Sequence, residues 1–423
     1  MKKFFIILGL VLTISPALAN KKGRMADGDK NIFGLPSFIF QTYQFPGEEK
    51  GKTRLEVKIG LVNDVIQFVK LNENRFRAGY ELTIDIVDKN MSQIEGTVVN
   101  REIFASSFRE TNSRKRLNKE SLNFSIAPGN YTIHLDILDL DTRKHLKREE
   151  KITVASFDAK SPRLSSLVFL ETKSAEDTDL EQNLPKIFMH EDRDIFVRYV
   201  LSGFSQTDSI KITYLIQDWN KRPIKSWKET LLAERESVIL TRSLSQHIQV
   251  TGQLSLKINC SQNGKSVDMH DNFLVKIRPR VGQNSPIMAS AFTNFEVFKY
   301  IMRSKEYKHF TSLDSVQRQN FLHDFWKQRD PSPETDFNEL KEEFTQRIQF
   351  SNNQFSVISK QKEGWNTDRG KIYIKFGKPD MVRNQTNKIG KPPLEIWFYR
   401  KSGKQFVFRD KSGEGDFVII HQE

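Results

Sequence analysis

The chain has 423 residues, with 66 lysine and arginine against 53 aspartate and glutamate residues, and a formal net charge of +13. Its one cysteine excludes an intramolecular disulfide, so stability must come from hydrophobic cores, and this length predicts two or three domains. The basic residues are spread along the chain rather than clustered, which argues against nucleic acid as a partner and favours another anionic partner or a protein.

Residues 1–19 predict a signal peptide. Lys2 and Lys3 precede an apolar run, Phe4 to Ile14, and Ala17 to Ala19 supplies a small-x-small cleavage site. The run is shorter than the roughly 20 residues that a spanning helix needs, so a permanent membrane anchor is the weaker alternative. No cysteine follows the run, which disfavours a lipoprotein. We expect an exported chain, periplasmic or extracellular, that is cleaved near Ala19, is soluble and has no later transmembrane segment.

A polar, flexible leader over residues 20–36 is expected to precede a first β-sandwich over 37–158. Apolar residues alternate with polar ones in several short segments of this region, as in strands with one buried face: Leu55 to Ile59, Leu82 to Ile86 and Tyr131 to Ile137. The stretch Ala127 to Tyr131 resembles the turn and tyrosine that open a late strand in immunoglobulin-like sandwiches.

The same alternation predicts a second immunoglobulin-like sandwich over residues 159–282. It appears in Ile195 to Leu201, Ile210 to Ile216 and Phe273 to Ile277. Cys260 lies in the alternating run Leu254 to Cys260, which places its side chain on the apolar face. A buried small hydrophobe is therefore a better prediction for Cys260 than a nucleophile.

Over residues 283–423 the apolar spacing first changes to helical and then returns to strands, which predicts an α+β domain. One helix is expected around Leu313 to Trp326, and a second over Phe337 to Ile348 with Thr335 as its N-cap. Strands are expected at Ile372 to Phe376 and then at three later segments, namely Glu395 to Tyr399, Gln405 to Phe408 and Phe417 to Ile420.

Two segments of this domain carry a family resemblance. The first contains Arg329, Asp330 and Pro331; the second contains Gly364, Trp365, Thr367, Asp368, Arg369 and Gly370 and continues to Gly377, Pro379 and Asp380. Together they resemble the GWxTD-domain proteins of bacterial envelopes. The resemblance implies a secreted bacterial protein with β-rich segments ahead of the domain. It implies no catalytic residue, cofactor or metal, and none is predicted.

These motif residues allow a structural and a functional interpretation. In the first, Trp365 fills a core, Asp368 pairs with Arg329 or Arg369, and the glycines permit tight turns. Asp330 can then cap a turn, and Thr367 or Asp368 can accept backbone hydrogen bonds. In the second, the loop is a recognition surface with Trp365, Trp397 and Tyr399 as aromatic anchors.

Two classes of function remain open. A binding or scaffold protein of the envelope, whose partner is an envelope protein or an anionic component, is the first prediction. The alternative is a secreted or periplasmic hydrolase that uses carboxylates of the C-terminal domain, with His323, Asp324, Asp330 and Asp368 as candidates. Nucleophile-base motifs, metal-ligand spacing and phosphate loops are absent from the sequence, which favours binding.

Overall fold

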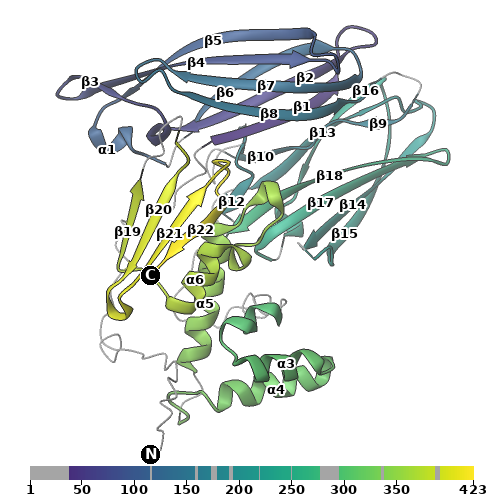
Figure 1. The fold of residues 1–423 in the computed structure, drawn as a ribbon. Helices are drawn as coiled ribbons and strands as arrows, with labels where there is room; N and C mark the ends of the chain where they lie inside the picture. Colours follow the sequence, from purple (N-terminus) through teal and green to yellow (C-terminus); the bar gives the residue numbers. More distant parts are fainter. Residues whose placement is uncertain are drawn as a thin grey trace, which may run out of the picture. The chain divides into compact units, whose positions relative to one another are not determined.

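A computed structural model describes residues 38–114, 117–157, 161–172, 179–189, 194–218, 220–248, 250–276, 295–334, 338–385 and 391–423. The predicted signal peptide and the leader that follows it lie outside these residues. The described chain is mainly β, with several antiparallel sheets, as predicted (Figure 1). Within the described residues, no helix is both long and apolar enough to cross a membrane.

Two sheets form the first β-rich region. One has the order β1-β2-β6; the other has the order β3-β4-β7-β8, with β5 paired to β4. The strands are β1 Phe38–Pro46, β2 Thr53–Val62, β3 Val69–Asn72, β4 Arg75–Val87, β5 Gln93–Ala105, β6 Leu117–Ile126, β7 Gly129–Asp139 and β8 His145–Val154. Two short helices, η3 (Asn63–Val65) and α1 (Phe108–Thr111), lie between strands.

The inward side chains of both sheets share one hydrophobic core. Val57 of β2, Ile84 of β4 and Leu135 of β7 are each at most 1% exposed within it. At the start of β7, the Tyr131 hydroxyl donates a hydrogen bond to the Ala127 carbonyl oxygen at 3.0 Å. This bond from a tyrosine to the backbone a few residues upstream is the one found in tyrosine corners, so the resemblance at this turn extends to its geometry.

Two further sheets form the second β-rich region. Their orders are β11-β10-β13-β16, with β9 beside β13, and β12-β18-β17-β14-β15; β12 and β18 pair in parallel. The elements are β9 Arg163–Leu164, β10 Val168–Thr172, β11 Leu180–Gln182, β12 Ile187–Met189, β13 Ile195–Ser202, β14 Ser209–Asp218, β15 Pro223–Leu232, β16 Ser237–Ser243, η4 Ser245–His247, β17 Gly252–Gln262 and β18 Lys265–Lys276.

These two sheets also share a core, and Cys260 lies in it. Its side chain is fully buried on β17, as the alternation predicted, beside Ile258 of the same strand. Burial raises the pKa of the Cys260 thiol to about 12, so the thiolate is not formed near neutral pH. Cys260 therefore packs as a small apolar side chain.

Helices dominate the next part of the chain: η5 Phe295–Tyr300, α3 Ser304–Ser312, α4 Ser315–Lys327 and α5 Glu339–Phe355. Asp314 caps α4 by accepting hydrogen bonds from the amides of Val316 and Gln317. Helix α5 is capped by Asn338, whose side chain accepts from the Lys341 amide. The prediction of Thr335 as the cap of this helix was wrong, because the cap is Asn338, three positions later. Thr335 itself lies outside the described residues. The predicted start of α4 at Leu313 was also wrong, because Leu313 ends α3.

The predicted strand at Ile372 to Phe376 is a helix, α6, over Asp368–Phe376. Its residues Ile372, Tyr373 and Ile374 are all buried, because α6 lies between α5 and the sheet that follows. A short helix buried on more than one side shows a continuous apolar run, and such a run does not distinguish helix from strand. Short 3₁₀ turns, η6 Ile358–Lys360 and η7 Gly364–Asn366, precede it.

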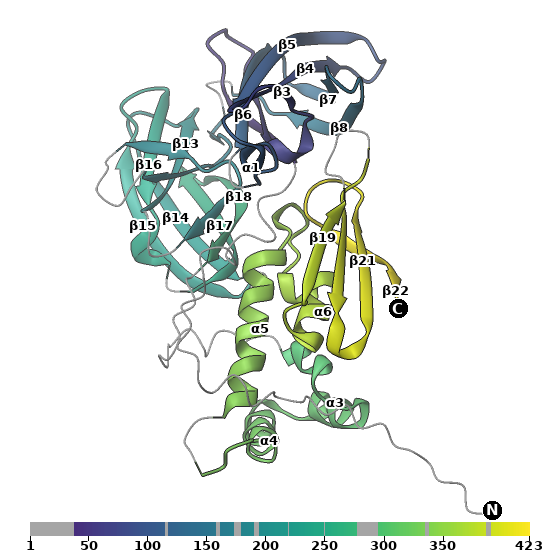
Figure 2. The same cartoon turned by 90° about the vertical axis from the view of Figure 1, so that its left-hand side faces the viewer.

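The chain ends in a four-stranded antiparallel sheet of order β19-β20-β21-β22. Its strands are β19 Met381–Gln385, β20 Leu394–Tyr399, β21 Lys404–Asp410 and β22 Phe417–Gln422, with η8 Arg400–Ser402 between β20 and β21. Three of these strands were predicted; β19 was not. Figure 2 shows α5 and α6 on one side of this sheet, where Phe355 and Tyr373 contact Trp397.

Candidate functional site

Gly364 and Gly370 allow the backbone at the motif to pack without intervening side chains. A Cβ on Gly364 would lie 1.8 Å from the carbonyl oxygen of Ser351 in α5, and one on Gly370 would lie 1.8 Å from the carbonyl oxygen of Gly364. The Gly364 amide donates to the Ser356 hydroxyl, and the Trp365 amide donates to the Asn352 side chain, at 2.8 and 2.9 Å. The motif is therefore fixed against α5.

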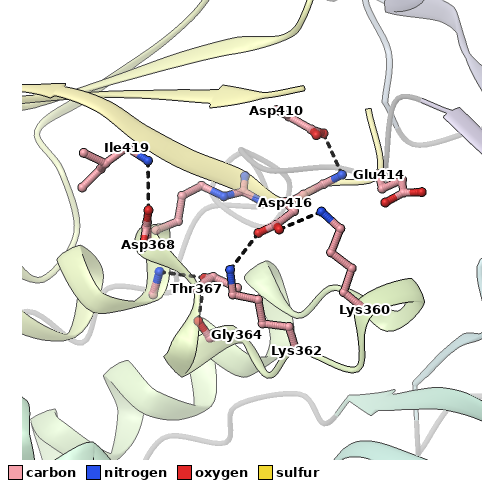
Figure 3. Close-up of polar contacts among 12 residues, drawn as sticks. Lys360, Lys362, Gly364, Thr367, Asp368, Asp410, Glu414, Asp416 and Ile419 are labelled. Carbon is pink, nitrogen blue, oxygen red and sulfur yellow. Dashed lines mark hydrogen bonds and ion pairs between the residues drawn. The ribbon is translucent and has the colours of Figure 1, made fainter. Parts of the chain in front are cut away.

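Thr367 and Asp368 begin helix α6 and attach it to the sheet (Figure 3). The Thr367 hydroxyl donates to the Gly364 carbonyl at 2.7 Å and accepts from the Gly370 amide at 3.1 Å, which makes Thr367 the N-cap. The Asp368 carboxylate accepts from the Ile419 amide of β22 at 3.0 Å and pairs with Lys371. As predicted, both side chains accept backbone hydrogen bonds here.

Each of two buried tryptophans donates its indole N–H to a glutamate two positions earlier. Trp365 donates to Glu363 at 2.7 Å, and Trp397 donates to Glu395 at 2.5 Å. Trp365 is 2% exposed and Trp397 is fully buried, so neither ring is at the surface in this structure. Neither glutamate was predicted from the sequence, where the repeated Glu-x-Trp spacing was the available signal.

Glu395 also faces Arg369, and both side chains are buried. Arg369 Nη1 lies 3.4 Å from the Glu395 carboxylate, and Nη2 donates to the Gly415 carbonyl at 2.9 Å. The guanidinium lies over the rings of Phe417 and Phe355, 4.1 and 4.9 Å from their centroids. Burial lowers the pKa of Arg369 and the Glu395 carboxylate raises it. The ion pair and the aromatic rings join α6 to β20 and β22.

The loop between β21 and β22 is organised by two aspartates. Asp410 accepts hydrogen bonds from the amides of Gly413 and Gly415 at 2.9 and 2.7 Å. Asp416 pairs with Lys360 and Lys362 at 2.9 and 3.0 Å (Figure 3). These contacts already occupy the carboxylates with internal donors.

No group of three histidine, cysteine or acidic side chains in the described residues is arranged to hold a metal ion.

The Arg-Asp-Pro segment lies apart from Asp368. Arg329 pairs with Glu306 at 2.5 Å and lies over the ring of Phe325, so the predicted pairing of Asp368 with Arg329 was wrong. The predicted pairing of Asp368 with Arg369 was also wrong, because Asp368 pairs with Lys371. Asp330 accepts from the Ser332 amide across Pro331, the turn predicted for it.

The Gly-x-Pro-Asp segment makes the turn from α6 to β19. Gly377 ends α6 with φ +76°, a region that favours glycine, and its carbonyl accepts from the Tyr399 hydroxyl at 2.9 Å. After the buried Pro379, the Asp380 carboxylate accepts from the Arg400 amide at 2.7 Å.

Among the hydrolase candidates, His323 and Asp324 are exposed on α4, distant in sequence from these contacts.

Glu363 gives the motif a pH dependence. Burial is the main cause that raises its pKa from 4.5 to about 7, and the bond from Trp365 opposes this. In the unfolded chain Glu363 loses its proton near pH 4.5, whereas in the folded chain it keeps the proton up to about pH 7. Glu363 should therefore lower the free energy of unfolding as the pH rises from about 4.5 to about 7. The total decrease should be roughly 3 kcal/mol at most.

The Glu363→Gln variant tests this expectation, because glutamine still accepts from the Trp365 indole but does not titrate. Urea unfolding from pH 4.5 to 7.5 should give a smaller decline in stability for the variant than for the wild type. Parallel curves for the two proteins would contradict the prediction.

The face of the four-stranded sheet opposite the helices carries adjoining apolar side chains among polar and charged ones. We call it the outer face and define it by the outward positions of the four strands and of the residue that follows them: Met381, Arg383, Gln385, Leu394, Ile396, Phe398, Gln405, Val407, Arg409, Val418, Ile420, His421 and Glu423. Met381, Val418 and Ile420 are 39, 44 and 43% exposed. This face was not predicted from the sequence, where the available signal was the segment Leu394 to Tyr399, which is apolar at five of six positions rather than at alternate ones.

Comparison with known proteins bears on the C-terminal part. Residues 274–418 match the sequence model of the GWxTD domain, which begins in β18, ahead of the predicted boundary at 283. Among curated proteins, no match was found.

Solved structures resemble parts of this chain at low similarity. Latent PorU from Porphyromonas gingivalis shares 10% identity over 57% of this chain and 20% of its own length, with a TM-score of 0.24. A glycosyl hydrolase family 2 member from Bacteroides cellulosilyticus shares 9% identity over 53% of this chain and 29% of its own, with a TM-score of 0.23. A D1–D4 ectodomain fragment of ICAM-5 shares 11% identity over 60% and 77%, with a TM-score of 0.19. The family match and the motif residues agree: residues 274–418 of this chain are a GWxTD domain.

Proposed function

We propose that the chain is an exported bacterial envelope protein that acts as a binding or scaffold module. Its proposed layout is two immunoglobulin-like β-sandwiches, over about residues 37–158 and 159–282, followed by an α+β GWxTD domain over 283–423. The signal peptide expected over residues 1–19 would direct it to the periplasm or beyond. Its partner is an envelope protein or an anionic envelope component.

The outer face is the observation that carries this proposal. In an antiparallel sheet with one solvated face, the outward positions are usually polar. Here β20 directs Leu394, Ile396 and Phe398 outward, and the flanking strands add Val407 and Val418. Apolar side chains that adjoin one another at a surface are typical of protein interaction sites.

The motif contacts support binding over hydrolysis. General acid-base or nucleophilic chemistry needs a carboxylate that can reach substrate. Asp368 is bonded to the Ile419 amide and Lys371, Asp410 to loop amides, and Asp416 to two lysines. The GWxTD motif is thus best understood as the support that holds α6 and the sheet in place.

Site-specific photocrosslinking in intact cells tests the proposal. A photoreactive phenylalanine at Val418 should yield a defined crosslinked envelope partner. Met91 is a matched control, since it is 68% exposed in the β4–β5 turn and lies outside the GWxTD domain. Identical products from both positions, or none from Val418, would count against binding through this face. Turnover of an envelope substrate by the purified chain would favour the hydrolase.

A further inference from the structure

Strand β5 lies at the edge of its sheet in the first β-rich region. It spans 13 residues, Gln93–Ala105, where strands of globular proteins usually have about five or six, and among the described strands it pairs with β4 alone (Figure 1). An edge strand presents a row of backbone N–H and C=O groups to any strand that can pair with it. The edge of β5 is therefore a site at which another strand can be added.

Strand β5 lacks several features that usually block pairing at a sheet edge. It contains neither lysine nor proline, and its register shift lies at its start, before Glu95. Only Ala105 of the strand is buried, and the apolar side chains of Val98 and Phe104 are 57 and 49% exposed. A long edge strand with exposed apolar side chains is typical of a surface at which proteins associate.

The charges of β5 favour a second copy of the same strand as the partner. Residues that face each other on antiparallel strands lie on the same side of the sheet, so in a two-fold pair of identical strands one residue lies opposite itself. With Val98 in that position, Glu95 of each copy lies opposite Arg101 of the other. Registers centred on Thr97 or Val99 set no acid opposite a base, and one centred on Arg101 sets two arginines against each other.

Both charged side chains are accessible for this pairing. Glu95 is exposed. Arg101 donates from Nε to Glu120 of β6 at 2.8 Å and from Nη1 to the Asn100 carbonyl at 3.1 Å, yet its side chain is 44% exposed and a guanidinium has further N–H donors. Exposed ion pairs contribute little to stability, so these pairs would set the register, while backbone hydrogen bonds and the contact of the two Val98 side chains hold the copies together.

A second copy also has an entropic advantage over a flexible segment of another protein. Ordering a flexible segment into a strand costs conformational entropy at every residue. The β5 strand of a second copy is already held extended by its pairing with β4. In the register centred on Val98, residues 95–101 of each copy pair without any further ordering of the backbone.

We propose that the chain forms a two-fold dimer in which β5 pairs antiparallel with β5 of a second copy, with Val98 opposite itself. The two sheets that contain β5 then join into one continuous sheet. This dimer uses a surface distinct from the outer face and does not depend on the proposed function.

Cysteine crosslinking of the full-length chain tests the register. Val98→Cys should form an interchain disulfide under mild oxidation, because Cα atoms opposite each other on antiparallel strands are about 4.5 or 5.5 Å apart, within disulfide range. Asn100→Cys is the matched control. It is exposed on the same face of β5 but would lie opposite Gly96, about 14 Å from its own counterpart. The native Cys260 is buried and should not crosslink.

Sedimentation equilibrium tests the association itself. The dimer dissociation constant should rise at least about tenfold in Val98→Lys, which sets two like charges opposite each other, and severalfold in Glu95→Arg, which sets arginine opposite Arg101. Ile239→Lys should leave it unchanged, since Ile239 is 68% exposed on β16, in the second β-rich region.

Three outcomes would overturn the proposal. The first is a chain that stays monomeric up to about 100 µM. The second is equal crosslinking by Val98→Cys and Asn100→Cys. The third is an unchanged dimer in Val98→Lys, once unchanged thermal unfolding shows that the variant folds; a dimer that Val418→Lys dissociates instead would assign self-association to the outer face. Crosslinking of an envelope partner from Val418 in cells tests the proposed function separately, so either proposal can fail alone.

Discussion

Replacing Arg369 by methionine is expected to lower the free energy of unfolding of the GWxTD domain by about 3–5 kcal/mol. Methionine retains much of the side-chain volume between Phe355 and Phe417 but removes the positive charge, and the fully buried Glu395 is then left without its cationic partner. Removing one member of a buried pair costs more than the pair contributes, because the remaining charge stays out of water.

Two controls separate this effect from general damage. Lys371→Met breaks the ion pair with Asp368, whose side chains are 38 and 24% exposed, and should cost less than about 1 kcal/mol. The double variant Arg369→Met with Glu395→Gln should be more stable than Arg369→Met alone, because glutamine still accepts from the Trp397 indole without a charge.

Urea unfolding followed by tryptophan fluorescence suits this measurement, since Trp326, Trp365 and Trp397 are three of the five tryptophans in the chain. An Arg369→Met variant as stable as Lys371→Met would show that the buried pair does not hold the domain together.

Alternating patterns predicted most of the strands correctly, because a strand with one buried face shows every second residue apolar. Val57, Ile84, Leu135 and Ile258 all lie in cores as that pattern requires. The pattern failed at Ile372 to Ile374, where burial on several sides makes a helix look like a strand. It also failed for β19, whose few residues are mostly exposed and show no alternation.

At the GWxTD motif, the type of a residue predicted what its side chain does more reliably than it predicted which residue the side chain contacts. Thr367 and Asp368 were expected to accept backbone hydrogen bonds, since short polar side chains do so near helix ends. The partner of Asp368 could not be predicted, because its two contacts join Lys371, one turn along α6, and Ile419, far along the chain. Arg369 was a candidate partner for Asp368, yet it points to Glu395 in β20, a pairing fixed only when α6 packs on the sheet.

Gly364→Ala and Gly370→Ala are each expected to destabilise the GWxTD domain by at least about 3 kcal/mol. Helix propensity alone predicts that Gly370→Ala would stabilise the domain, because alanine in a helix interior is favoured over glycine by about 1 kcal/mol. The added Cβ, however, would lie 1.8 Å from the Gly364 carbonyl oxygen, and at Gly364 it would lie 1.8 Å from that of Ser351. Backbone atoms cannot rotate away, so η7 would have to separate from α5 or from α6.

Gly403→Ala is the matched control for these two substitutions. Gly403 lies in the β20–β21 turn at φ +65° with no atom near its Cβ position, so alanine there carries only the strain of the left-handed region, about 1–2 kcal/mol. In the same unfolding assay, both motif variants should therefore have a lower free energy of unfolding than Gly403→Ala. If the three variants are equally stable, the contact of η7 with α5 and α6 is looser than the structure places it, and the buried motif would be free to open toward a ligand.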